Sequence, residues 1–197
     1  KMSLVAIYFE MLGVRFGYSL DAMLISNIIN GDQADLSEAA PVVGVTDPAK
    51  HLTYADLVRV WVRGGLLARM YDQMIANEAE TNLIMNLDEY KNRQAGTTLP
   101  LKVEVPIPQV PTLYPHISVP DDQVILLDKR YGHVQLVAAP MMVESEKIIS
   151  RQIEQSFASI TTGFTKLFRD SSIIIDEGET FAGDYDFPSW QVVGFED

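Results

Sequence analysis

The feature that most constrains the fold is a pattern of short apolar runs and turn residues in the second half of the chain. Two apolar runs, Val124–Leu127 and Val134–Ala138, flank the polar residues Asp128–Gly132. This pattern predicts a β-hairpin in which the glycine supplies a positive φ. The β-branched run Ile173–Ile175 predicts a buried strand. A chain with this pattern builds at least part of its core from β-sheet.

The N-terminal part of the chain has a different period. From Met2 to Asn30 the apolar side chains recur close to every 3.6 residues, which predicts a long amphipathic helix ending near Asn30-Gly31. Glu10 and Arg15 interrupt its apolar character, and the sequence offers no membrane span. We therefore expect a protein without membrane contact.

Shorter elements are expected after the long helix. Thr53 and Asp56 have the spacing of a capping box and predict the start of a helix, which Gly64-Gly65 is expected to break or kink. The other predictions here are a strand at Val42–Val45, a second helix at 66–77, a strand at Asn82–Met85 and one or two helical turns at 88–93.

Two segments resist a simple assignment. Six of the ten prolines lie between Pro100 and Pro120, which predicts extended or edge-strand backbone because proline cannot donate a hydrogen bond to a sheet. From residue 149 to residue 168 the apolar spacing is helical, but the β-branched residues 160–162 favour a strand. Both possibilities stay open for this segment.

Acidic residues outnumber basic ones, 27 to 15, and give a net charge of −12. Non-specific binding of nucleic acid needs Lys and Arg to neutralise phosphates, so this balance argues against that function. Hydrophobic content of 47% and charged content of 21% are ordinary for a globular protein. The absence of Cys excludes disulfides and thiolate metal sites.

Residues for catalysis or metal binding do not occur in recognisable patterns. His51, His116 and His133 are scattered, and none has the spacing of a zinc site. Nucleophile-elbow, P-loop and dinucleotide-binding motifs are missing. The acids between Asp176 and Asp186 could offer oxygens to Ca²⁺ or Mg²⁺, but they fail the EF-hand register, and a solvated loop is the simpler interpretation. We expect no catalytic residue, no metal and no cofactor.

Several segments, in this order, resemble a known family. The segments ILLDKRYGHVQL, APMMVESEK and RQIEQSFASITTGFTKLFRDSSIIID resemble the C-terminal half of tailed-bacteriophage major capsid (head) proteins of the Hong Kong 97 type. Upstream, SLDAMLISN and NLIMNLDEYKNR are similar to two more landmarks of these proteins. The resemblance spans approximately residues 1–178.

The resemblance implies an α+β, phage major-capsid-like fold with a long spine helix, a peripheral domain and an axial domain. Residues 1–50 would form the first part of the peripheral domain with the spine helix, and residues 51–140 the axial domain. Residues 141–197 would supply the return strands of the peripheral domain and an acidic, aromatic C-terminal arm.

The implied function is structural, without enzyme activity. Copies of the chain would self-assemble into an icosahedral phage or prophage head that encloses DNA without sequence-specific contacts. Assembly would take place in the host bacterial cytoplasm, and the product would be part of the virion. Two alternatives stay open: an encapsulin-type nanocompartment shell, and a small metal-dependent hydrolase whose site is assembled from scattered acids.

In a shell, three groups of residues are candidates for subunit contacts. The first comprises charged residues at the predicted hairpin tip, where exposed charges of both signs would steer association. The second surrounds the predicted helix break, and the third is an aromatic residue of the C-terminal arm, which would dock on its own body or on a neighbour. The candidates are Asp128, Lys129 and Arg130; Arg59, Arg63 and Arg69; and Trp190.

Overall fold

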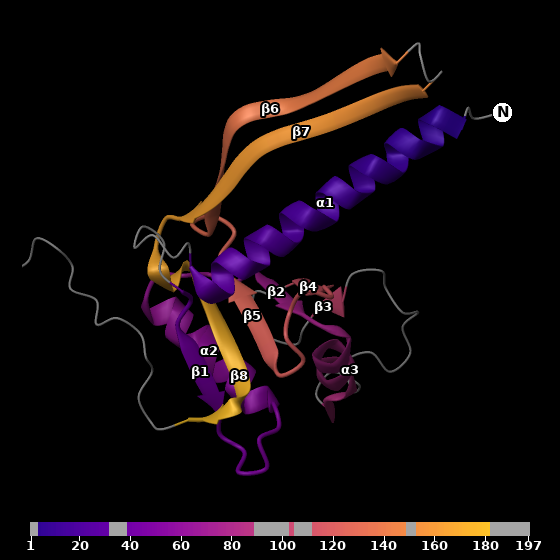
Figure 1. Ribbon diagram of the computed structural model, residues 1–197. Helices are drawn as coiled ribbons and strands as arrows, with labels where there is room; N and C mark the ends of the chain where they lie inside the picture. The colour runs from indigo at the N-terminus through magenta and orange to yellow at the C-terminus, as the bar shows by residue number, and fades with distance from the viewer. Residues whose placement is uncertain (1–3, 32–38, 89–102, 105–111, 149–152, 182–197) are drawn as a thin grey trace, which may run out of the picture.

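The computed structural model describes residues 4–31, 39–88, 103–104, 112–148 and 153–181 (Figure 1). The helices are α1 (Leu4–Asn30), α2 (Tyr54–Leu66) and α3 (Glu78–Asn86), with a short 3-10 helix at Arg169–Ser171. The strands are β1 (Val42–Val45), β2 (Gln73–Ala76), β3 (Val103–Glu104), β4 (Thr112–Pro115), β5 (Gln123–Leu127), β6 (His133–Ile148), β7 (Ile153–Lys166) and β8 (Ser172–Thr180). This mixture of helices and strands confirms the predicted α+β class.

The molecule has a lobe and an arm that projects from it (Figure 1). The lobe is built on a six-stranded mixed sheet in the order β1-β8-β5-β2-β4-β3, in which β1–β8 and β2–β4 are the parallel pairs. The arm consists of α1 and the long antiparallel pair β6–β7. Within the arm, α1 runs alongside the two strands and contacts β7.

The central strands of the sheet are buried on both faces, because alternate side chains of a strand point to opposite sides. Ile173 and Ile175 of β8 pack into the core that α2 covers, whereas Ile174 packs into the core that the last turns of α1 cover. Ile125 of β5 joins Ile174 on the α1 side. This burial explains why both strands are continuous apolar runs in the sequence.

Local signals set the predicted helix boundaries. The Thr53 side chain accepts a hydrogen bond from the Asp56 N–H, and the Asp56 carboxylate accepts one from the Thr53 N–H, so the capping box at the start of α2 is confirmed. Gly31 ends α1 with φ 70°, a left-handed conformation that favours glycine. In the part of the chain that the structure describes, no helix has the length and apolarity to cross a bilayer.

The predicted hairpin is wrong, although both of its apolar runs are strands. β5 pairs with β2 and β8 in the lobe, whereas β6 pairs with β7 in the arm. Residues 128–132 therefore carry the chain from one sheet to the other. Gly132 does not have a positive φ. Packing disfavours a side chain there, since an added Cβ would lie 3.0 Å from the Asp128 carbonyl oxygen.

Two assignments between residues 66 and 86 also need correction. The expected helix at 66–77 is absent, because the chain turns at Ala68, with φ 56°, and then forms β2 between β4 and β5. The expected strand at 82–85 is part of α3, which begins where the Asn77 side chain accepts a hydrogen bond from the Glu80 N–H. The predicted strands at β1 and β8 are confirmed.

The open question about residues 149–168 is decided in favour of a strand, since β7 occupies Ile153–Lys166. The Pro-rich segment is extended at β3 and β4, and residues 105–111 lie outside the described part, as do residues 89–93 of the expected helical turns. The six-stranded sheet takes strands from all three predicted domain segments. The division into peripheral and axial domains stays a prediction.

One buried carboxyl lies in the lobe at the start of α3. Glu80 is 3% exposed, and among the described residues its Oε2 has no hydrogen-bond partner. Burial, followed by the negative charges of Glu177, Asp122 and Asp121, raises the pKa of Glu80 to about 7. The folded chain therefore binds a proton at Glu80 more tightly than the unfolded chain does.

We expect Glu80→Gln to stabilise the protein at pH 8 and to change little at pH 4.5. Because the folded-state pKa is raised, the contribution of Glu80 to stability is greatest at low pH and is lost as the pH rises to about 7. The difference in Tm between variant and parent should grow by a few degrees across this range, since about 1 kcal/mol shifts Tm by roughly 2–4 °C at this size. Exposed Glu78, in the same helical turn, supplies the control Glu78→Gln. A difference in Tm between Glu80→Gln and the parent that does not change with pH would contradict the prediction.

The adjacent glycines of α2 should respond oppositely to alanine. A Cβ at Gly64 would lie 2.5 Å from the Tyr71 ring, whereas a Cβ at Gly65 would have no neighbour within 4 Å. We expect Gly64→Ala to destabilise the fold by about 1–3 kcal/mol through overpacking. Gly65→Ala should stabilise it by up to about 1 kcal/mol through helix propensity. Urea denaturation measures both changes, and shifts of the same sign would refute this account.

Candidate assembly surfaces

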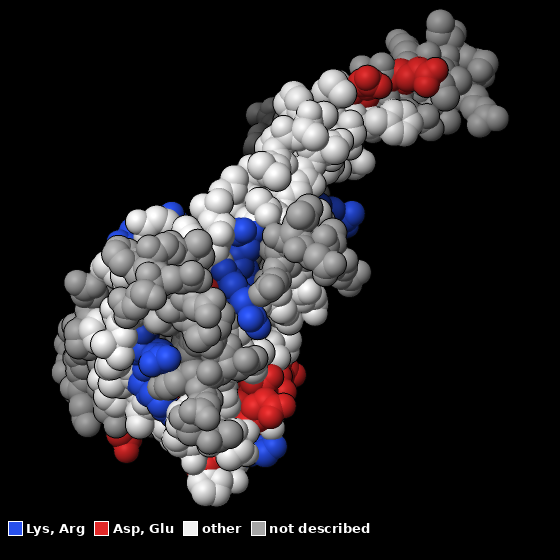
Figure 2. Space-filling model, turned by 90° about the vertical axis from the view of Figure 1, so that its left-hand side faces the viewer, with Lys and Arg blue, Asp and Glu red and all other residues white. Residues whose placement is uncertain are grey.

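The arm exposes an unusual amount of apolar surface. On α1, Tyr8, Met11 and Tyr18 are each about 60% exposed, and on β7 Phe157 is 58% exposed. Further exposed apolar side chains of the arm are Ile7, Phe9, Val14, Met23, Val134, Leu136, Val137, Met141, Met142 and Val143. In the view of Figure 2 most of the shaft of the arm carries neither sign of charge. Exposed apolar surface on this scale marks an interaction site.

The β6–β7 ribbon has two strands and two open edges within the described residues. An isolated two-stranded ribbon is marginally stable in water, and a long open edge invites pairing with another chain. Pro140 lies where the register between β6 and β7 shifts, between Val137 and Met142. Because proline has no N–H to donate, it interrupts the ladder at this point and limits uncontrolled edge pairing.

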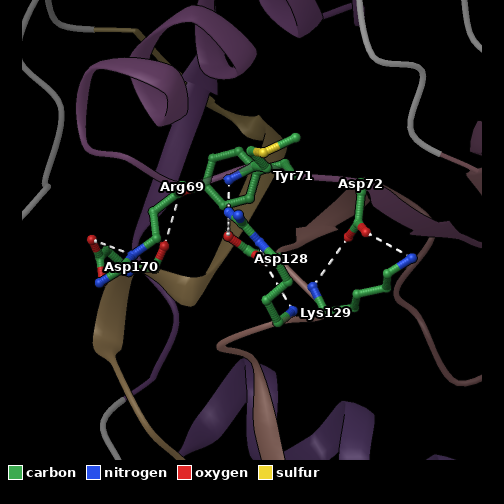
Figure 3. Close-up of polar contacts among 8 residues, drawn as sticks. Arg69, Tyr71, Asp72, Asp128, Lys129 and Asp170 are labelled. Atoms are coloured by element: carbon green, nitrogen blue, oxygen red, sulfur yellow. Dashed lines mark hydrogen bonds and ion pairs between the residues drawn. The ribbon is translucent and has the colours of Figure 1, made fainter.

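Polar and aromatic residues gather where the arm joins the lobe. We call this group the neck cluster; it consists of Arg69, Tyr71, Asp128, Tyr131, Phe168 and Asp170. They come from three segments: the loop between α2 and β2, the crossing from β5 to β6, and the crossing from β7 to β8. Figure 3 shows the loop residues facing the two crossings.

A buried ion pair lies at the centre of the neck cluster (Figure 3). The Nε and Nη2 atoms of Arg69 donate to the two carboxylate oxygens of Asp170, each at 3.0 Å, and both side chains are 7% exposed. The Tyr71 hydroxyl donates to the Asp170 carbonyl at 2.9 Å. Burial, and then the charge of Asp170, raises the pKa of Tyr71 above its usual value, so Tyr71 stays a donor. Breaking a buried pair of this kind typically costs about 3–5 kcal/mol.

Asp128 is fully buried, which corrects the expectation that it would be exposed at a hairpin tip. Its carboxylate accepts hydrogen bonds from the Met70 N–H at 2.9 Å and from the Arg130 guanidinium at 2.9 and 3.1 Å. Burial alone would raise the pKa of Asp128, but these hydrogen bonds hold it below its usual value. Asp128 is therefore a charged anchor between the β5–β6 crossing and the loop after α2.

The other candidate contact residues lie closer to the surface. Lys129 is exposed and pairs with Asp72 at 3.1 Å, a surface ion pair that contributes little to stability. Arg59 pairs with Asp56 and lies over the Phe181 ring, 4.1 Å from its centroid. Arg63 lies on the last turn of α2 and is half-buried. Trp190 falls outside the described residues. A role for these side chains in subunit contacts stays a prediction.

Sequence reasoning missed four of the six residues of the neck cluster: Tyr71, Tyr131, Phe168 and Asp170. No local pattern marks them, because Asp170 lies about a hundred positions from Arg69 along the chain. The bidentate partner of a buried arginine is decided by the course of the strands. The one usable signal was that Asp170 precedes the apolar run Ile173–Ile175 by only a few residues, which places a charged side chain close to a buried strand.

The described acids near the end of the sheet are not arranged as a metal site. In the described residues, no group of three or more acidic or histidine side chains is arranged to hold a metal ion. Glu177 instead accepts a hydrogen bond from the Leu52 N–H, Asp121 accepts one from the Asn77 side chain, and Asp176 accepts one from Gln123 at 2.8 Å. Asp184 and Asp186 lie outside the described part. His133 is held neutral, since burial and then the charge of Lys166 lower its pKa to about 4.

Comparison with known proteins identifies the fold. No family model and no curated protein matches the sequence. Among solved structures, the chain is similar to the holo-SrpI encapsulin complex from Synechococcus elongatus PCC 7942, with a TM-score of 0.62 and 16% identity over 95% of this chain and 69% of that one. It is also similar to the capsid of an empty GTA particle (TM-score 0.58, 12% identity, 85% of this chain and 65% of that one). A third similar structure is that of Mycobacterium phage Che8 (TM-score 0.59, 12% identity, 90% and 65%).

The chain thus spans about two thirds of the length of these relatives. At 12–16% identity the similarity concerns the fold alone. The lobe, the long helix and the β6–β7 ribbon together have the phage major-capsid-like fold that the sequence resemblance predicted.

Proposed function

We propose that this protein is the repeating subunit of a closed protein shell. The single observation that carries the proposal is the arm, whose apolar side chains are exposed in one copy of a chain that has the fold of shell proteins. Copies of the chain would cover this surface on one another. Repetition of modest interfaces by symmetry then adds up to a stable container.

Within this class we favour a major capsid protein of the Hong Kong 97 type from a phage or prophage. The ordered segments of the sequence resemblance support this choice. The net charge of −12 suits a wall around DNA, because it disfavours sticking to phosphates. The subunit would assemble in the bacterial cytoplasm into an icosahedral head, become part of the virion, and enclose DNA without specific contacts.

An encapsulin-type compartment is the second candidate, since an encapsulin structure aligns with 95% of this chain. Such a shell would enclose protein cargo in place of DNA. Both candidates work by association, and neither uses a catalytic residue. A metal-dependent hydrolase has less support, because Asp121, Asp176 and Glu177 accept hydrogen bonds from the backbone and from amide side chains.

We expect the full-length gene product to form uniform hollow particles in negative-stain electron microscopy. Nuclease-protected DNA in particles from the native source would favour the capsid, and co-purifying protein cargo would favour the compartment. A full-length product that stays monomeric at high concentration would overturn the shell function.

The exposed ring of Phe157 provides a direct test of the arm as an interface. Phe157→Asp should leave the stability of the isolated subunit within about 0.5 kcal/mol, because the ring is 58% exposed there. It should weaken each contact between copies by about 2 kcal/mol and abolish particles. Phe157→Leu keeps the site apolar and should still assemble. Normal assembly of Phe157→Asp, measured by sedimentation velocity, would show that this part of the arm stays uncovered.

A further inference from the structure

We infer that Arg69 sets the direction in which the β6–β7 ribbon leaves the lobe. The ribbon joins the lobe through two chain crossings, residues 128–132 before β6 and residues 167–171 after β7. Arg69 belongs to neither crossing but contacts both of them. It is therefore a positioning residue for the arm.

On the side after β7, Arg69 makes its two hydrogen bonds to Asp170 and lies over the Phe168 ring, 4.5 Å from the centroid. On the side before β6, it lies 5.4 Å from the centroid of the Tyr131 ring. The two rings meet edge to face, with centroids 5.9 Å apart and planes at 85°. A planar guanidinium can make a fork of hydrogen bonds and stack on rings at the same time, which an ammonium cannot.

Backbone hydrogen bonds tie the two crossings to each other. The Asp128 N–H donates to the Ser171 carbonyl at 2.8 Å, and the Leu167 N–H donates to the Gly132 carbonyl at 3.3 Å. These bonds make the root of the ribbon one unit. These bonds do not define the angle between the ribbon and the α2 side of the lobe. That angle depends on the loop between α2 and β2, which carries Arg69.

The other neighbour of the root, α1, packs loosely against it. An open cavity of about 250 Å³ lies between the end of α1 and the base of β7, lined by Met23, Ser26, Asn27, Gly31 and Phe164. This space leaves the contact between α1 and the base of the ribbon incompletely packed. On the side of the root away from α1, the buried Arg69 side chain contacts both crossings.

The consequence for assembly rests on the proposed shell function. In a symmetric shell, the angle between the arm and the lobe of each subunit determines how neighbouring lobes tilt, and so the curvature of the wall. Loss of the Arg69 contacts would permit a range of angles. Subunits would then close into particles of mixed diameter.

The test follows the angle between arm and lobe in the full chain through a distance between one position on each. Because the sequence has no Cys, spin labels can be attached to Ser159→Cys on β7 and Ala79→Cys on α3, two exposed positions on the arm and on the lobe. Pulsed electron resonance then gives the distribution of distances between them, with labelled subunits diluted into unlabelled ones. We expect Arg69→Met and Arg69→Lys to broaden this distribution about twofold, as for a freed hinge.

Circular dichroism must show that each variant is folded, and Arg69→Lys decides the question if Arg69→Met does not fold. Arg15→Lys, on the exposed part of α1, is the matched control and should keep the parent distribution. An unchanged distribution in a folded Arg69 variant would overturn the inference. Failure of the parent protein to form particles would count against the shell function alone, since the distance measurement does not depend on assembly.

Discussion

The structure depends on the burial of its central strands on both faces. β5 and β8 place alternate residues into two separate cores, so the sheet needs a helix on each side. α2 closes one face, and the last turns of α1 close the other. Because the end of a 27-residue helix is committed to the lobe, its remaining turns must extend away from it. The arm is a consequence of how the core is closed.

Because of the arm, exposed apolar surface is distributed unequally over the molecule. The lobe has a buried core and single exposed apolar side chains such as Leu66 and Ile117, while the arm exposes apolar side chains along α1, β6 and β7. Between them lies the neck cluster, where buried charges from three segments meet in fixed geometry. Such pairs contribute little net stability, but their directional hydrogen bonds define one arrangement of the segments that they join. A neck of defined geometry between the lobe and the exposed apolar arm would suit the proposed shell subunit, which must repeat the same contacts many times.

Much of the fold was predictable from local patterns, and the errors arose where tertiary contacts decide the structure. Capping at Thr53, the end of α1 and the β-branched strand at Ile173–Ile175 depend on neighbouring residues, and these predictions are confirmed. The hairpin prediction failed because β5 pairs with β2 and β8, which are distant in the sequence, while β6 pairs with β7, the next strand along the chain. The spacing in β7 suggested a helix because residues 157–165 are exposed or half-buried, so no buried core imposes a period of two on the apolar residues of this strand.

By itself, the sequence determined the mixture of helix and strand, the buried strand at Ile173–Ile175, the end of α1, the start of α2 and the lack of recognisable catalytic motifs, because each depends on residue types at short spacing. The tertiary structure alone decided that Asp128 is buried, that Arg69 holds Asp170, and that apolar residues of α1 and β6–β7 stay on the surface. These facts arise from which distant segments meet. Burial and ion pairing depend on contacts between segments that are far apart in the sequence, and no local pattern specifies these contacts.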